Sequence, residues 1–98
     1  MIYVIATLRV KREKLSTLLE AARAVIAATR KEDGCIFYDL HQSVTDPDQV
    51  VFVERWASRE ALGKHFEAPH MVPWRAAAAD CVVERKVEII TPENVETR

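Results

Sequence analysis

Two of the three histidines in the chain lie five positions apart, in the stretch ALGKHFEAPHMVPW at residues 61–74. An imidazole has an unperturbed pKa of ~6.5, so His65 and His70 are well suited to move protons at neutral pH. We therefore take both as candidate catalytic residues. The alternative is structural: a half-buried ring at His65 with one nitrogen bonded to the backbone, and a polar residue that opens a helical segment at His70.

The spacing of the two histidines does not favour a metal site. Residues five apart on an unbroken helix point about 140° away from each other, unlike the i, i+4 pair that binds zinc from one face. Finger-type zinc sites also need a close pair of cysteines, and Cys35 and Cys81 are far apart in the sequence. Pro69 could bend the chain and bring the rings together, but we expect no bound metal.

No cofactor is expected either, because Gly34 and Gly63 are the only glycines and form no nucleotide-binding motif. If the protein is an oxygenase, its substrate must then be its own reductant, such as a deprotonated hydroquinone or phenol. The protein would then supply a base, a pocket that excludes water and a donor for developing negative charge. Our candidate residues for binding a flat aromatic substrate are Tyr38, Phe37, Trp56, Phe66 and Trp74, and plain core packing is the alternative for Trp56 and Phe66.

Short predicted elements must position these side chains. Residues 2–9 are β-branched and aromatic and predict a strand, and apolar residues at spacings of three and four predict an amphipathic helix over residues 12–31. Gly34 would cap the end of that helix. Residues 35–42 and 50–56 predict two strands joined by the turn TDPD, and Glu54 in the second is expected to be a paired structural carboxylate.

The remaining residues predict helix and then strand. Ser58 can cap a short helix that ends before Pro69, and Pro73 can open a further helical segment that runs to Asp80. Residues 81–90 predict the last strand, before a polar tail. The order β-α-β-β-α-β predicts an α+β, ferredoxin-like fold with an antiparallel sheet and both helices on one face.

The two central strands are apolar on both faces. IYVIATL and VVFV carry apolar residues at odd and even positions alike, so both faces of the sheet centre favour burial. Two helices cover only one face, and a second copy of the chain could cover the other. We therefore predict a homodimer.

Composition excludes some partners. The 14 Lys and Arg residues against 15 Asp and Glu give a net charge of -1, so neither nucleic acid nor an anionic membrane is expected as a partner. The apolar start stops at Arg9, short of the ~20 residues of a spanning helix, and does not resemble a signal peptide. Two cysteines without a CxxC spacing suit free thiols in a reducing compartment. We expect residues 1–98 to form a single cytoplasmic domain.

The stretches EDGCIFYDL and FVERWASREALGKHFEAPH resemble the antibiotic biosynthesis monooxygenase family, and the resemblance covers nearly the whole chain. It implies a dimeric α+β barrel with quinol monooxygenase-like activity, which is oxidation of a hydroquinone, an anthrone or a related phenolic by molecular oxygen without a cofactor. His65 and His70 would then assist deprotonation of the substrate. The positions that carry the resemblance are Gly34, Cys35, Tyr38, Phe52, Glu54, Trp56, Leu62, His65 and His70.

Other functions known in that family stay open to different degrees. Its haem-degrading members share an Asn on the first strand and a Trp on the short helix, whereas here the only Asn is Asn94 and the short helix has no Trp. A non-oxidative isomerase or lyase for a small polar ligand would use cations such as Lys64 or Arg75. A dimeric ligand-binding module without catalysis is the third possibility.

Overall fold

The computed structural model describes residues 1–98 as four strands, three α-helices and one short 3-10 turn. None of the helices is both long enough and apolar enough to cross a bilayer. The elements in chain order are β1 (Ile2–Val10), the 3-10 turn η1 (Arg12–Lys14), α1 (Leu15–Thr29), β2 (Cys35–Gln42), β3 (Gln49–Trp56), α2 (Arg59–Phe66), α3 (Met71–Cys81) and β4 (Val82–Ile90).

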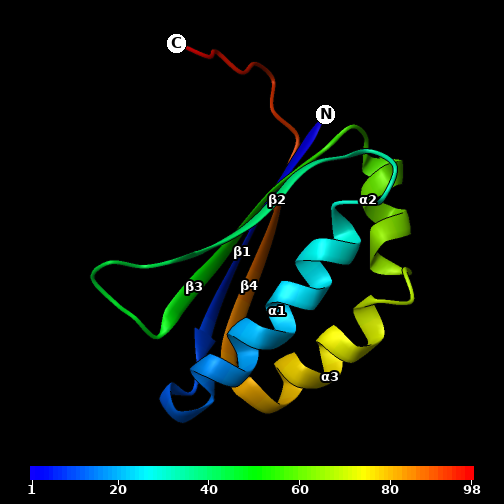
Figure 1. Ribbon diagram of the computed structural model, residues 1–98. Helices are drawn as coiled ribbons and strands as arrows, with labels where there is room; N and C mark the ends of the chain where they lie inside the picture. The colour runs from blue at the N-terminus through cyan, green and yellow to red at the C-terminus, as the bar shows by residue number, and fades with distance from the viewer.

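The four strands form one antiparallel sheet in the order β2-β3-β1-β4. All three helices lie on the same face of this sheet (Figure 1). The arrangement confirms the predicted α+β, ferredoxin-like fold. Strand β1 lies in the middle of the sheet, although it comes first in the sequence.

The core lies between the helices and one face of the sheet. Burial alternates along β1 and β3, as a sheet with one packed face requires. The helix-facing row of β1 runs from Ile2 to Val10, and α1 packs Leu18, Ala22 and Val25 into the same core. This alternation turns Phe52, Glu54 and Trp56 toward the helices as well.

Several boundaries differ from those predicted. Helix α1 starts after a 3-10 turn and ends at Thr29, and Gly34 lies five residues beyond that end rather than capping it. Helix α3 begins at Met71, before Pro73, because a proline in the first turn gives up no helical hydrogen bond. The same helix keeps Cys81, which is fully buried, so β4 begins one residue later than predicted.

Gly34 fixes the approach of the α1–β2 turn to helix α2. It is the only residue with a positive φ, at 86°, and its carbonyl accepts a hydrogen bond of 2.8 Å from the amide of Ala57. A Cβ at this position would lie 2.6 Å from the Cβ of Ala61. The turn can therefore pack tightly against α2 only with glycine here.

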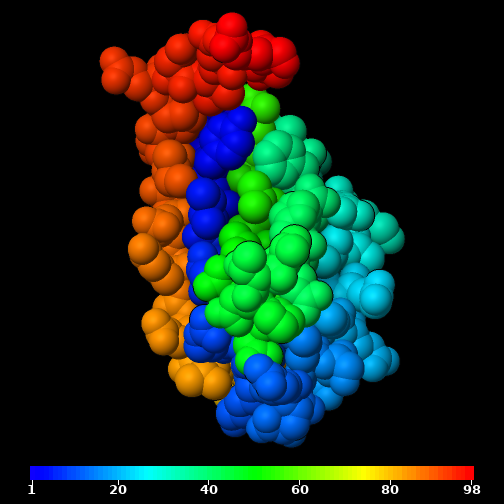
Figure 2. Space-filling model, turned by 90° about the vertical axis from the view of Figure 1, so that its left-hand side faces the viewer, coloured from blue at the N-terminus to red at the C-terminus, as the bar shows by residue number.

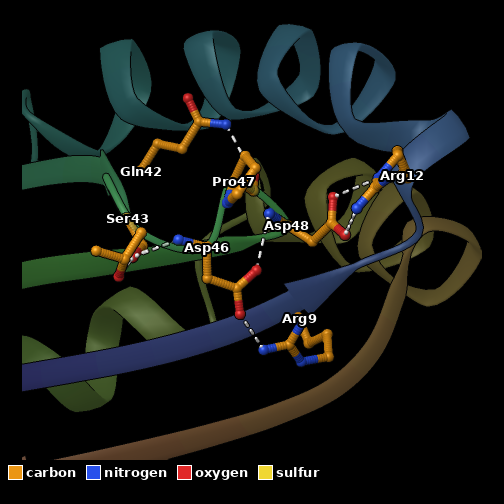
Figure 3. A network of polar contacts seen from close by, with 8 residues as sticks. Arg9, Arg12, Gln42, Ser43, Asp46, Pro47 and Asp48 are labelled. Atoms are coloured by element: carbon orange, nitrogen blue, oxygen red, sulfur yellow. Dashed lines mark hydrogen bonds and ion pairs between the residues drawn. The ribbon is translucent and has the colours of Figure 1, made fainter.

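The turn between β2 and β3 is held by polar contacts to the end of β1 and to the 3-10 turn that follows it (Figure 3). Arg9 at the end of β1 pairs with Asp46, and Arg12 pairs with Asp48 at 3.1 Å. Inside the turn, Gln42 donates to the carbonyl of Pro47 at 2.8 Å. Exposed pairs of this kind add little stability, so their main effect is on the orientation of the turn.

The other face of the sheet carries no helix (Figure 2), with β4 in orange, β1 in blue and the β2–β3 hairpin in green lying side by side. Its central residues are half-buried and partly apolar, and Ile5 on β1 is paired with Val53 on β3. The predicted second copy would cover this face, and it stays a prediction at this point.

Gly34→Ala tests the close approach of the turn to α2. We expect it to lower the free energy of unfolding by about 1–3 kcal/mol from the positive φ alone, with an added loss from the clash with Ala61. Urea titration followed by circular dichroism measures this change.

Gly63→Ala is the matched control. Gly63 lies inside α2, where the nearest atom to an added Cβ is Nη1 of Arg59 at 3.6 Å. Alanine favours the helix, so this variant should gain about 0.5–1 kcal/mol. Equal effects at the two glycines would contradict the assignment of strain to Gly34.

Candidate active site

The carboxylate of Glu32 joins the two histidines. Its Oε2 atom lies 2.7 Å from Nδ1 of His65 and 2.8 Å from Nε2 of His70. Helix α2 ends at Phe66 and α3 begins at Met71, so the chain bends around Pro69 and is not helical between the histidines. Their ring centroids are therefore only 6.2 Å apart, and the separation expected on an unbroken helix does not apply.

His65 is the buried member of this cluster, with 2% of its surface exposed. Its ring lies between Trp56, at 4.7 Å between centroids, and Tyr38, at 5.3 Å. Burial lowers the imidazole pKa, while the hydrogen bond to Glu32 acts in the opposite direction. The ring is therefore held in one orientation and favours the neutral form.

The hydrogen bond to Glu32 also decides which nitrogen of His65 is free. An ionised carboxylate can only accept, so Nδ1 carries the proton and Nε2 keeps its lone pair. Nε2 of His65 makes no hydrogen bond within the protein. Every fully buried side-chain nitrogen or oxygen has a partner, so Nε2 is not fully buried and must be open to a cavity. Since His65 lines the main cavity, Nε2 is the atom that a bound molecule can reach.

That cavity has a volume of about 670 Å³ and lies between the sheet and helices α2 and α3. Its volume falls within the range of ~300–1,000 Å³ typical of small-molecule sites. Most of its lining is apolar. The lining residues are Val4, Ala6, Leu8, Tyr38, Phe52, Glu54, His65, Phe66, Met71, Trp74, Arg75, Ala78, Ala79, Val82, Val83, Glu84, Arg85 and Val87.

Glu54 adds a second titratable group to the cavity. It is buried, and its Oε1 accepts a hydrogen bond of 3.0 Å from Nε1 of Trp56. Burial raises its pKa to about 7, and the nearby charge of Glu32 acts in the same direction. Glu54 thus forms no ion pair, so the expectation of a paired structural carboxylate is wrong: its partner is the neutral indole of Trp56, and it lines the cavity in a form that can donate or accept a proton near neutral pH.

The cavity gathers some of the predicted site residues and not others. His65, Tyr38, Phe66 and Trp74 all line it. Trp56 is fully buried behind His65, and His70 lines a smaller hollow of about 140 Å³ beside α1. Phe37 lies on the opposite face of the sheet, 6.2 Å from the ring of Tyr3.

Sequence reasoning missed Glu32. It lies in the stretch KEDGC next to Asp33, and no local pattern distinguishes the two acids. Only the packing of this turn against α2 shows which carboxylate reaches the histidines. The one signal in the sequence is Gly34, because a glycine that permits close approach marks a turn held against another element.

The sequence profile of the antibiotic biosynthesis monooxygenase family matches residues 1–77, which include β1 to β3, helix α2 and both histidines. The chain belongs to this family. The match therefore confirms the resemblance seen in the sequence.

Relatives within the family are similar over most of the chain. A Mycobacterium tuberculosis protein named "Putative monooxygenase Rv0793" is 39% identical over 77 residues, which are 79% of this chain and 75% of the relative. An Escherichia coli K12 protein named "Probable quinol monooxygenase YgiN" is 28% identical, covering 94% of this chain and 98% of the relative. The solved structure of Rv0793 matches with a TM-score of 0.90 at 32% identity over 98% of both chains. The likeness to Rv0793 thus extends over the whole fold.

Glu54→Gln should change how stability depends on pH. Because the folded-state pKa of Glu54 is about 7, above its ordinary value of 4.5, the folded state holds this proton more tightly and wild-type stability falls as pH rises between these values. Glutamine keeps the acceptor for Trp56 without the charge. Its stability relative to wild type should be about 2 kcal/mol more favourable at pH 8 than at pH 5, in urea titrations.

Glu20→Gln, on the exposed side of α1, is the control and should show no such difference between the two pH values. Parallel behaviour of wild type and Glu54→Gln across this pH range would mean that Glu54 is not buried as described.

Proposed function

We propose that the protein is a monooxygenase that oxidises a hydroquinone, an anthrone or a related phenolic with molecular oxygen and needs no cofactor. One observation carries the proposal. His65 has one ring nitrogen held by Glu32 and the other free toward a largely apolar cavity with aromatic walls. A base fixed in this way beside a largely apolar cavity can ionise a phenol, which is the step that lets the substrate reduce oxygen.

The reaction balances without an external reductant. His65 Nε2 takes a hydroxyl proton from a hydroquinone, and the resulting phenolate passes one electron to oxygen, forming a semiquinone and superoxide. Their combination forms a carbon–oxygen bond, and the O–O bond of the peroxide then breaks while the same carbon loses its hydrogen. Hydroquinone and one O2 become a hydroxyquinone and one water, and all four electrons come from the substrate.

Glu32 acts in this scheme as a positioning residue for His65. By accepting the Nδ1 proton it fixes the tautomer and stabilises the imidazolium that forms when Nε2 takes a proton. Tyr38 and Glu54 are the other polar groups of the cavity close to this chemistry. Burial keeps the pKa of Tyr38 high, so its hydroxyl stays protonated and can donate to developing negative charge.

The aromatic walls fit the proposed substrate class. Tyr38, Phe52 and Trp74 lie in contact along one side of the cavity, with Phe52 5.1 Å from Tyr38 and 5.4 Å from Trp74 between centroids. Such a wall favours a flat apolar ring system, and Phe66 adds a further apolar surface. The relative named as a quinol monooxygenase supports the same class.

Removal of the base is the direct test. We expect chelator-treated protein to consume oxygen with a panel of benzo- and naphthohydroquinones, above autoxidation. His65→Ala should lower the rate by about 100-fold or more, as loss of a general base does, and His65→Gln should do the same with less loss of volume. His41→Ala, an exposed histidine on β2, should keep the wild-type rate.

Two results would redirect the proposal. An unchanged rate in folded His65→Ala would remove this histidine from the mechanism. Conversion of a ligand under nitrogen, with no oxygen uptake in air, would favour the isomerase or lyase function instead. Glu32→Gln separates positioning from binding, since Glu32 does not line the cavity: kcat should fall while KM stays close to wild type.

We also propose that the active protein is a homodimer joined through the helix-free face of the sheet. The support is the row of half-buried apolar residues at the centre of that face, Ile5 on β1 with Val51 and Val53 on β3. A second sheet laid against it would bury these side chains at a spacing of about 10 Å between sheets.

A charge at the centre of the face tests the dimer. Wild type should sediment at twice the 11.2 kDa mass of one chain at micromolar concentration, and Val53→Lys should sediment as a monomer. Val44→Lys is the control, because Val44 is 99% exposed in the hairpin turn and should leave the dimer intact. Monomeric wild type would refute the proposed interface.

A further inference from the structure

Three potential metal ligands converge where Glu32 joins the histidines. Glu32, His65 and His70 each offer one ligand atom, and these atoms all lie within 4.8 Å of one another. Glu32 Oε2 is 2.7 Å from Nδ1 of His65 and 2.8 Å from Nε2 of His70. The α1–β2 turn, helix α2 and the residue before α3 contribute one ligand each. Two imidazoles and a carboxylate are a common set for zinc and related divalent ions.

We propose that Glu32, His65 and His70 bind one divalent transition-metal ion of the zinc class, and that bound metal prevents His65 from acting as a base. The effect on activity rests on the proposed monooxygenase function. The metal site itself does not, because it follows from the arrangement of the three side chains.

The two hydrogen bonds to one oxygen bring three potential ligand atoms close to the spacing that a metal ion requires. A carboxylate offers four lone-pair sites on two oxygens, yet both imidazoles direct a nitrogen at the same Oε2 atom. Two ring nitrogens and one carboxylate oxygen thus lie close together, and each can offer a lone pair to a metal once the two imidazoles carry their protons on their other nitrogens. Ligands about 2.0–2.2 Å from a tetrahedral zinc lie about 3.3 Å apart. The observed 2.7 and 2.8 Å therefore need to open by about 0.5 Å, and the ligand atoms of the two histidines, which lie within 4.8 Å of each other, need to close toward the same spacing.

The site is partly preorganised and can be reached. Trp56 and Tyr38 hold the ring of His65 from two sides, and the hydroxyl of buried Thr29 lies 3.3 Å from Nε2 of His70. The side chains of Glu32 and His70 are 15% and 25% exposed, which leaves a path for an ion from solvent. With three protein ligands, a fourth position stays available for water.

Metal at this site would reverse the role of the free nitrogen of His65. In the metal-free protein, Nδ1 carries the proton and Nε2 has the lone pair that faces the cavity. A metal needs the lone pair of Nδ1, so the proton of the neutral ring moves to Nε2. The cavity then contains a hydrogen-bond donor where it had a base, and the proposed deprotonation stops.

Cobalt titration of the chelator-stripped protein tests the site without reference to activity. We expect one Co²⁺ per chain, visible absorption bands typical of nitrogen and oxygen ligands, and displacement by Zn²⁺. His70→Ala and Glu32→Gln should each weaken cobalt binding strongly. Loss of a residue that only supports a metal ligand lowers affinity by about 10–100-fold, and loss of a ligand itself should lower it by more. His41→Ala, which lies outside the cluster, should bind as wild type does.

The proposal fails if wild type gives no saturable cobalt spectrum, or if the spectrum is unchanged in Glu32→Gln and His70→Ala. Circular dichroism checks that both variants are folded, and His70→Gln repeats the test should the alanine variant unfold. These readouts decide the metal site even if the protein consumes no oxygen, in which case the proposed function fails and the site stands.

Zinc inhibition tests the second half of the proposal. In an active preparation, one equivalent of Zn²⁺ should abolish oxygen uptake by wild type, and excess chelator should restore it. Undiminished uptake by protein that holds its zinc would overturn the link between metal and base.

Discussion

The contact between Glu32 and the two histidines is the interaction on which the site depends. A carboxylate in a partly buried turn is costly unless charged or polar partners repay its lost hydration, and here two imidazoles do so at 2.7 and 2.8 Å. Gly34 makes the contact possible, because only a residue without a Cβ lets this turn approach α2. The bend at Pro69 supplies the second imidazole.

The sheet supplies the other half of the site by keeping its two faces distinct. Alternation along β3 turns Phe52, Glu54 and Trp56 toward the helices, where they form the wall and support of the cavity. The same alternation turns Val51 and Val53 to the helix-free face. One strand therefore serves the chemistry with its even-numbered residues and the proposed subunit contact with its odd-numbered ones.

Local patterns in the sequence predict the fold well and the site only in part. Strand β2 is predicted to the residue, and the Ser58 cap is present, because strand-favouring residues such as Ile36, Phe37 and Tyr38 and capping side chains act over a few positions. The contacts of the site are long-range: Glu32 is separated by 33 residues from His65 and by 38 from His70. Local sequence patterns cannot predict contacts at such separations. The prediction of Phe37 at the cavity fails for a local reason: neighbouring residues of a strand face opposite sides of the sheet, so Tyr38 and Phe37 cannot both line the cavity.

The position of β1 in the sheet has a consequence for how the chain acquires its structure. Strand β1 pairs on one edge with β3 and on the other with β4. The second edge therefore has no partner until β4 has been synthesised. Contacts between such distant segments slow folding, since the intervening chain must be ordered before they form. During synthesis this edge of β1 thus stays unpaired until β4 is made, and an unpaired apolar strand edge favours aggregation.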